Sequence, residues 1–215
     1  MKVLAVNGSP RKKWNTARLL EKALEGASGA GAGTGLVHLY DLTYRGCSSC
    51  FACKRIGGPS YGSCAIRDDL TPWLDELAGA DAIILGSPVY FFAETGEMRS
   101  CMERLCFPYL RYSNPPSSLF PRRIRTALVL TMNITEDGVS SLGLDRIIEI
   151  SRGFMERVFG NCEILLSTDT LQFDDYSKYD NSRFDSEAKL RRRHEVFPHD
   201  EAQAFALGKR MASPL

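Results

Sequence analysis

Residues 1–16 combine a short apolar run, a tight turn and a polar loop that leads into a helix. Residues 3–6 are continuously apolar, which is typical of a parallel strand covered on both faces. Gly8 and Pro10 end this run, and Asn15 and Thr16 are favourable N-cap residues for the periodic apolar segment that follows. Because a helix start carries unpaired N–H groups and the positive end of the helix dipole, the loop is suited to bind an anion such as phosphate.

The side chains of this loop support the same interpretation. Ser9, Asn15 and Thr16 can donate further hydrogen bonds, and three cations follow one another at residues 11–13. The competing interpretation is an ordinary strand-to-helix turn with a solvated basic tip. The loop alone does not separate the two, because most helix starts bind nothing.

The strand pattern recurs along the chain. Apolar runs at residues 36–40, 82–85, 126–131 and 164–166 are separated by segments with helical periodicity, such as Met98, Cys101, Met102 and Leu105. Strands that alternate with helices predict a parallel sheet with right-handed crossovers. The glycine-rich stretch 27–35 predicts a flexible surface connector between the first helix and the second strand.

We expect a single domain over residues 1–215, since a chain of this length with 44% hydrophobic residues can bury a sizeable core. Residues 169–198 are polar with scattered aromatic residues, which favours an arm that contacts a second copy of the chain, followed by a final helix. Residues 114–118 form a polar loop that is a candidate lid over a site.

Charge and apolar patterning exclude several classes of protein. The net charge of +1 argues against a nucleic-acid partner. No apolar run approaches the ~20 residues that cross a bilayer, and the N-terminal apolar run is too short for a secretory signal, so we expect no membrane partner and a cytoplasmic location. Without an export signal, the seven cysteines are better interpreted as thiols or metal ligands than as a disulfide framework.

In an open parallel sheet, ligands bind beyond the carboxyl ends of the strands. Three loops should meet there: residues 7–16, 87–92 and 131–133. The first is suited to phosphate, and the second carries a Pro-Val-Tyr-Phe-Phe surface suited to a flat ring. Together they predict a phosphorylated aromatic cofactor, although the aromatic residues of the second loop taken alone fit a structural role.

Three motifs then carry a resemblance to a known family. The Gly-Ser-Pro-Arg…Asn-Thr loop at residues 8–16, the Cys-x-x-Cys-x-x-Cys…Cys-x-Ile-x-Asp-Asp segment at residues 47–69 and Gly-Ser-Pro-Val-Tyr at residues 86–90 are similar to those of the NADPH-dependent FMN reductases and their iron–sulfur flavoprotein relatives. The likeness covers residues 1–170. It implies a flavodoxin-like α/β fold with a doubly wound five-stranded parallel sheet of order 2-1-3-4-5 in three α/β/α layers.

The resemblance also implies FMN at the strand ends, a homodimer or homotetramer, and a set of binding residues. In the first loop, the residues expected to contact the FMN phosphate are Ser9, Arg11, Lys13, Asn15 and Thr16. In the second and third loops, the residues expected to contact the isoalloxazine are Pro88, Val89, Tyr90 and Phe91, and Thr131, Met132 and Asn133. Relatives often have a small residue before the Asn-Thr pair, whereas this chain has Trp14, which can reshape the loop or cover the cofactor.

The cysteine spacing leaves three interpretations open. Cys47, Cys50 and Cys53 can place three thiolates on one 4Fe–4S cluster with Cys64 as the fourth ligand. In iron–sulfur flavoproteins the fourth cysteine follows the third closely, whereas ten residues separate Cys53 from Cys64 here. A zinc site and plain thiols are the alternatives.

The leading functional hypothesis is an FMN-dependent NAD(P)H oxidoreductase that passes electrons from a nicotinamide co-substrate through FMN to a small-molecule or protein acceptor. The cofactor supplies the chemistry, so no catalytic side chain is assigned. One alternative is an iron–sulfur flavoprotein that carries electrons. Another is a non-catalytic thiol-based redox-responsive binding protein. The choice between NADPH and NADH stays open, as does the acceptor.

Overall fold

The computed structural model describes residues 1–215 and contains one central parallel sheet. Its strand order is β2-β1-β3-β7-β8, with a short β4 paired antiparallel to β3, so the order 2-1-3-4-5 of the five main strands is confirmed. The strands are β1 (Lys2–Asn7), β2 (Gly33–His38), β3 (Ala82–Tyr90), β4 (Ala93–Glu94), β7 (Arg125–Thr131) and β8 (Glu163–Ser167).

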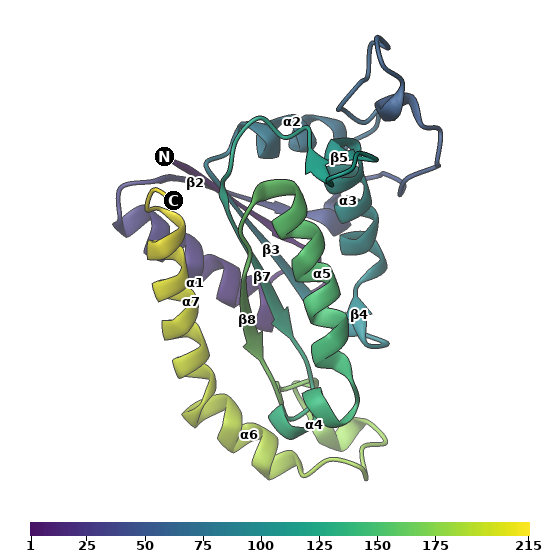
Figure 1. The fold of residues 1–215 in the computed structure, drawn as a ribbon. Coiled ribbons are helices and arrows are strands. Elements are labelled where there is room, and N and C mark those ends of the chain that lie inside the picture. The colour runs from purple at the N-terminus through teal and green to yellow at the C-terminus, as the bar shows by residue number, and fades with distance from the viewer.

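Helices cover both faces of this sheet in three layers (Figure 1). The helices are α1 (Asn15–Gly29), α2 (Thr71–Gly79), α3 (Gly96–Cys106), α4 (Glu136–Ser141), α5 (Leu144–Phe159), α6 (Ser186–Glu195) and α7 (Phe197–Met211). Alternate residues of β1 face opposite layers: Val3 and Ala5 pack in the core under α1 and α7, while Leu4 and Val6 pack in the core under α2, α3 and α5. The strands are therefore apolar on both faces, as the sequence predicts.

The glycine-rich connector is shorter than the sequence predicts. Residues 27–29 complete α1, and Gly33 already pairs with Lys2 in β2. Gly35 pairs with Leu4 in this strand, and the position favours glycine because a Cβ atom there would come within 2.9 Å of the Leu4 side chain. The strand is at the edge of the sheet, where glycines that weaken a central strand are tolerated.

Helices α1 and α7 approach each other through two glycines. A Cβ atom on Gly26 would lie 2.0 Å from the Phe205 carbonyl oxygen, and one on Gly208 would lie 1.7 Å from the Ala23 carbonyl oxygen. Only glycine permits backbones to pack this closely. Helix α7 is thereby held closely against α1, whose N-terminus follows the loop at residues 8–14.

The polar segment 169–198, which the sequence suggests is an extended arm, contains regular secondary structure. It includes a 3-10 turn, η4 (Tyr176–Lys178), and helix α6, and it passes below the carboxyl edge of the sheet before α7 begins (Figure 1). Tyr176 is buried against its own chain, and Phe173 stacks on Tyr179 with ring centroids 4.0 Å apart. These aromatic residues therefore organise the segment itself.

Residues 114–118 do not cover the carboxyl edge, so the lid interpretation is wrong. They belong to a hairpin in which residues 112–116 connect β5 (Leu110–Arg111) to β6 (Ser117–Ser118), and this hairpin lies at the end of α3 away from β4 (Figure 1). The pairing of these two short strands decides where the loop lies, and the polar composition of the loop could not predict it. No helix of the chain has both the length and the apolar character needed to span a membrane.

Candidate functional site

The carboxyl ends of β1, β3, β7 and β8 surround one cavity. It is lined by Ser9, Arg11, Trp14, Asn15, Thr16, Pro88, Val89, Tyr90, Thr131, Met132, Asn133, Thr170, Leu171 and Gln172. The three loops selected from the sequence therefore meet, as expected for an open parallel sheet. We refer to this space as the edge cavity.

Residues 8–16, which we call the phosphate loop after the role expected from the sequence, present backbone donors to the edge cavity. The first backbone N–H groups of α1, from Asn15 and Thr16, have no partner in the chain, and the N-cap residue Trp14 provides no side-chain cap. Asn15 and Thr16 are buried, so water is a poor partner for these donors. Unpaired donors at a helix N-terminus favour a bound anion, because the dipole adds to the hydrogen bonds.

Turns of the loop itself fix these donors in place. The Asn7 carboxamide oxygen accepts from the N–H of Ser9 at 3.0 Å, and the Ser9 hydroxyl accepts from the N–H of Arg11 at 3.1 Å. Gly8 packs so closely on α3 that a Cβ atom would lie 2.8 Å from the Met98 Cβ atom. A side chain at residue 8 would push the loop away from α3.

The Asn15 side chain has a structural role that the sequence did not indicate. Its Nδ2 donates to the Leu171 carbonyl oxygen at 2.9 Å, and its Oδ1 accepts from Arg193 Nη1 at 2.9 Å. Leu171 and Arg193 therefore fix the orientation of the carboxamide, and one Nδ2 hydrogen remains beside the backbone N–H as a donor for an anion. Thr16 Oγ1 lies 2.7 Å from Thr131 Oγ1 and joins the first loop to the third.

The second loop forms a strained hairpin. Tyr90 pairs with Ala93, and the two residues between them, Phe91 and Phe92, have φ angles of 49° and 66°. Bulky side chains at positive φ cost of order 1–2 kcal/mol each. Pro88, Val89 and Tyr90 line the edge cavity, whereas Phe91 is fully exposed at the tip and does not.

Sequence reasoning assigned no cofactor contact to four residues of the edge cavity, Trp14, Thr170, Leu171 and Gln172, although it singled out Trp14 as a residue that can cover the cofactor. The last three follow β8, so the carboxyl-edge rule that selected the other loops would have found them if applied to the fifth strand. Trp14 Nε1 donates to the Leu171 carbonyl oxygen at 3.1 Å, and Arg11 Nη1 donates to that of Gln172 at 2.5 Å. The bulky residue in the phosphate loop thus anchors the C-terminal segment over the cavity.

Lys189 of α6 fixes the position of the third loop, residues 131–133, through contacts with Asn133. Its ammonium group is almost fully buried and contacts the Asp169 carboxylate and both oxygens of Asn133. Asp169 has a φ angle of 51°, a conformation that its ion pair to Lys189 helps to stabilise. Asn133 Nδ2 in turn donates to Gln172 Oε1 at 2.8 Å, so α6 positions a residue of the edge cavity.

Residues 45–68, which we call the cysteine segment, run along α3 away from the edge cavity. Tyr44 Oη donates to the Glu97 carbonyl oxygen in the first turn of α3, and the Lys54 ammonium contacts the Phe107 and Leu110 carbonyl oxygens beyond its last turn. Helix α3 has 11 residues. At 1.5 Å per residue, the helix separates these two contacts by about 16 Å.

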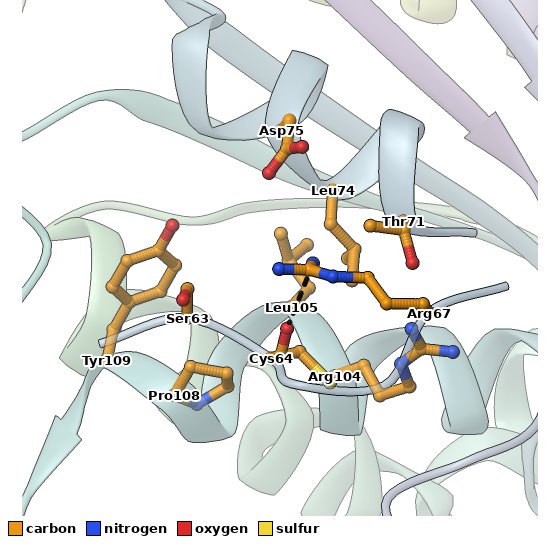
Figure 2. A pocket seen from close by; sticks show the side chains of 10 residues that line it. All are labelled: Ser63, Cys64, Arg67, Thr71, Leu74, Asp75, Arg104, Leu105, Pro108 and Tyr109. Carbon is orange, nitrogen blue, oxygen red and sulfur yellow. Dashed lines mark hydrogen bonds between the residues drawn. The ribbon is translucent and has the colours of Figure 1, made fainter. Parts of the chain in front are cut away.

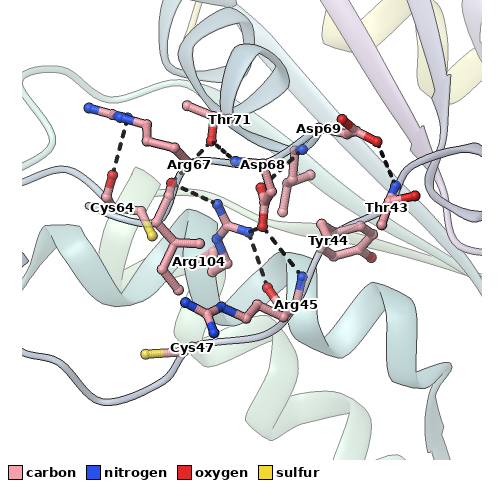
Figure 3. Close-up of polar contacts among 12 residues, drawn as sticks. Thr43, Tyr44, Arg45, Cys47, Cys64, Arg67, Asp68, Asp69, Thr71 and Arg104 are labelled. Atoms are coloured by element: carbon pink, nitrogen blue, oxygen red, sulfur yellow. Dashed lines mark hydrogen bonds and ion pairs between the residues drawn. The ribbon is translucent and has the colours of Figure 1, made fainter.

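Buried Arg104 fastens the two ends of the cysteine segment (Figure 3). Its guanidinium donates to the Arg45 and Ile66 carbonyl oxygens at 3.1 and 3.2 Å and pairs with Asp68 at 2.5 Å. Desolvation opposes ionisation of the Asp68 carboxyl, but the Arg104 hydrogen bond and charge, with backbone N–H donors, outweigh it and lower the pKa of Asp68.

The structure does not bring the four cysteines of the segment together. No three Cys, His, Asp or Glu side chains form a group that could hold a metal ion. Cys47 and Cys50 are exposed, Cys53 is buried and Cys64 is half-buried. In this arrangement the four thiols are not grouped as the ligands of one metal centre.

Cys64 instead lines a second cavity between α2 and the end of α3 (Figure 2). Figure 2 shows the Tyr109 hydroxyl and the Arg67 guanidinium on its walls, with Asp75 of α2 above them. Burial raises the pKa of the Tyr109 phenol. This cavity lies beside the cysteine segment and shares no residue with the edge cavity.

Comparison with known proteins gives a family and a fold. The family model described as NADPH-dependent FMN reductase matches residues 1–121, just over half of the chain. An iron–sulfur flavoprotein of Archaeoglobus fulgidus is 38% identical over 104 residues, which are 48% of this chain and 48% of that protein. One of Methanocaldococcus jannaschii is 38% identical over 104 residues, 48% of this chain and 51% of that protein. The chain thus matches about half the length of these curated relatives.

Solved structures resemble the whole chain in fold. The NAD(P)H:quinone oxidoreductase from Methanothermobacter marburgensis superposes with a TM-score of 0.72 at 16% identity, covering 100% of this chain and 98% of that one. An azoreductase from Bacillus anthracis superposes with a TM-score of 0.67 at 15% identity, covering 98% of this chain and 99% of that one. At these identities the likeness concerns the flavodoxin-like fold.

Proposed function

Because the chain belongs to the NADPH-dependent FMN reductase family, we propose that it is an FMN-dependent NAD(P)H oxidoreductase. Electrons pass from a nicotinamide nucleotide through bound FMN to a small-molecule or protein acceptor. The observation that carries the proposal is the edge cavity, in which a phosphate-binding helix start and an apolar, aromatic wall face one space.

The residues of the edge cavity fit FMN in their chemistry. The backbone N–H groups of Asn15 and Thr16, with the Ser9 hydroxyl and the Arg11 charge, suit the phosphate. Pro88, Val89 and Tyr90 offer an apolar surface to the isoalloxazine, and residues 131–133 line the same cavity. Bound FMN supplies hydride acceptance and onward electron transfer.

The chain contributes position and shielding to this chemistry. The Thr16–Thr131 contact fixes the distance between the phosphate loop and the third loop. The Lys189 contacts fix the Asn133 carboxamide at the cavity wall. Residues 170–172 cover one side of the cavity and are held there by Trp14, Asn15 and Arg11, which limits the access of water.

Two measurements on the purified protein test this proposal. A fluorescence titration with FMN should show stoichiometric binding, and the loaded protein should oxidise NADPH or NADH with menadione or ferricyanide as acceptor. The proposal fails if the protein neither retains nor takes up FMN, or if the loaded protein does not consume either nucleotide.

The names of the curated relatives support a second candidate, an iron–sulfur flavoprotein that carries electrons. Cys47, Cys50, Cys53 and Cys64 are the available ligands, and the segment would have to rearrange to hold a 4Fe–4S cluster, because the structure does not group them. Iron and sulfide analysis after anaerobic purification decides between the candidates. Stoichiometric iron and sulfide support the carrier, stoichiometric zinc supports a structural metal site, and their absence leaves free thiols.

A homodimer or homotetramer is part of the proposal. Helix α5 leaves Ile147, Ile150 and Phe154 exposed on its surface, and an apolar groove between α3 and α5 includes Phe154. Contiguous exposed apolar residues mark contact surfaces. Light scattering should report a dimer or tetramer, and Ile150→Glu should shift it toward the monomer. A wild-type monomer at all concentrations contradicts this part of the proposal.

A further inference from the structure

A third cavity, separate from the edge cavity and from the one beside Cys64, is a hollow on the outer side of the phosphate loop. Its lining residues are Arg11, Lys12, Lys13, Trp14, Asp174 and Tyr179. Arg11 and Trp14 also line the edge cavity, so the two spaces adjoin each other across these side chains. We refer to it as the outer hollow. Lys13, which the resemblance assigned to the FMN phosphate, lines only this outer space.

The three cationic side chains of the outer hollow differ in whether a partner within the chain already binds them. Lys12 forms an ion pair with Asp41, and Arg11 is held by the Gln172 carbonyl oxygen and by the Trp14 ring, 5.2 Å from its centroid. Lys13 forms no hydrogen bond or ion pair in the chain. Since Asp174 is the single acidic residue of the lining, the hollow is positively charged and holds one uncommitted ammonium group.

The other wall of the outer hollow is aromatic. Tyr179 stacks on Phe173 with an interplanar angle of 11°, and the Tyr179 side chain remains about half exposed. The Phe173 contact holds the Tyr179 ring in place, and Trp14 supplies a second aromatic group. A rigid aromatic wall facing cations suits a planar base linked to phosphate, because stacking binds the base while the cations bind the phosphate.

We propose that the outer hollow binds the phosphorylated adenosine end of the nicotinamide co-substrate, and that Lys13 recognises its 2′-phosphate and so favours NADPH over NADH. This inference rests on the proposed oxidoreductase function. The inner donors of Asn15 and Thr16 are suited to the cofactor phosphate, which leaves Lys13 free for a second phosphate outside. The shared wall of Arg11 and Trp14 connects the two sites.

Binding of 2′,5′-ADP tests the outer hollow without turnover. Isothermal titration of the FMN-loaded protein should show 2′,5′-ADP binding at least fivefold tighter than 5′-AMP, and Lys13→Gln should remove this difference. Tyr179→Ala should weaken both nucleotides, and Tyr179→Phe should retain both. Inorganic phosphate serves as the probe that distinguishes a general anion site, since competition by phosphate at equal strength would overturn nucleotide recognition.

Kinetics of the same variants give the second readout. Lys13→Gln should raise the KM for NADPH about fivefold while the KM for NADH, the kcat and the FMN affinity stay within twofold. Lys22→Gln, a change at a half-buried lysine of α1 that pairs with Glu25, is the matched control and should change none of them.

The outcomes separate this inference from the proposed function. If Lys13→Gln weakens FMN instead of NADPH, Lys13 belongs to the cofactor phosphate and the inference is overturned. If the wild-type protein oxidises both nucleotides but does not bind 2′,5′-ADP more tightly than 5′-AMP, the inference fails and the proposed function stands. If it binds 2′,5′-ADP but oxidises neither nucleotide, the outer hollow is supported and the oxidoreductase proposal fails.

Discussion

Arg104 Nη1 of α3 lies 2.5 Å from Asp68 Oδ2, and the same nitrogen donates to the Arg45 carbonyl oxygen at 3.1 Å. One fully buried guanidinium therefore joins the beginning and the end of the cysteine segment to the core. Its Nε atom is buried without a hydrogen-bond partner, so the pair with Asp68 is the principal compensation for burying this charge.

Removing the Asp68 charge should destabilise the protein strongly. Asp68→Asn leaves a buried guanidinium without its counterion, and breaking such a pair costs about 3 kcal/mol. Urea denaturation followed by circular dichroism measures the free energy of unfolding. Asp75→Asn is the control, because Asp75 is exposed and forms no ion pair, and it should change this free energy by less than about 0.5 kcal/mol. Equal losses in the two variants would contradict the role of the pair.

The same pair should make stability depend on acid pH. The pKa of Asp68 is lowered in the folded state, so its contribution is present above the ordinary aspartate pKa of about 3.9 and is lost as the pH falls through the lower folded-state pKa. The melting temperature of the wild type should therefore fall more steeply below pH about 4 than that of Asp68→Asn. Parallel curves for the two proteins would rule out this linkage.

The seven thiols should differ in reactivity. Burial raises the pKa of Cys101 to about 12 and that of Cys162 to about 11, and it also raises the pKa of Cys106. Thiolate is the reactive form, so these three should resist an aromatic disulfide reagent at pH about 8 until the protein unfolds. The exposed Cys47 and Cys50 should react first. Mass spectrometry of timed samples assigns each site, and rapid labelling of Cys101 would contradict the packing.

The close approach of α1 and α7 should not tolerate a methyl group. Gly208→Ala places a Cβ atom against the Ala23 carbonyl oxygen and should cost about 2 kcal/mol of unfolding free energy, because the two backbones must separate. Gly29→Ala in α1 is the matched control. Nothing lies within 4 Å of a Cβ atom there, so this change should be neutral or stabilise by up to about 1 kcal/mol. Thermal denaturation of both variants provides the comparison.

A negative charge in the phosphate loop should discriminate between two flavins. Ser9→Asp places a carboxylate beside the donors of α1 and should weaken FMN binding at least tenfold, since like charges repel. Riboflavin lacks the phosphate, so its affinity should change less than twofold. Fluorescence titration measures both. A similar loss for riboflavin would show that the variant disturbs the loop instead of the phosphate contact.

The sequence predicted the parts of this protein that depend on local pattern. The apolar run at residues 3–6 and the later strands followed from periodicity, and the strand order followed from the family resemblance. The helix begins at Asn15 as predicted, but its N-cap is Trp14, so the prediction that Asn15 or Thr16 caps the helix is wrong. Ten of the twelve residues assigned to the cofactor line one cavity, while Lys13 and Phe91 lie outside it. Their residue types fit the assigned roles, but the direction of each side chain depends on the conformation of the loop.

Other features depend on contacts between residues far apart in the chain. Glycines 33 and 35 suggested a loose turn, yet pairing with β1 makes them a strand. Asn15 has the side chain of a phosphate ligand, yet Leu171 and Arg193 fix its orientation and leave one Nδ2 hydrogen as a donor. Local sequence determines which segments can form strands, helices and anion-binding turns. Only the tertiary structure decides which donors remain free at the edge cavity, because a distant segment can satisfy a hydrogen bond as well as a ligand can.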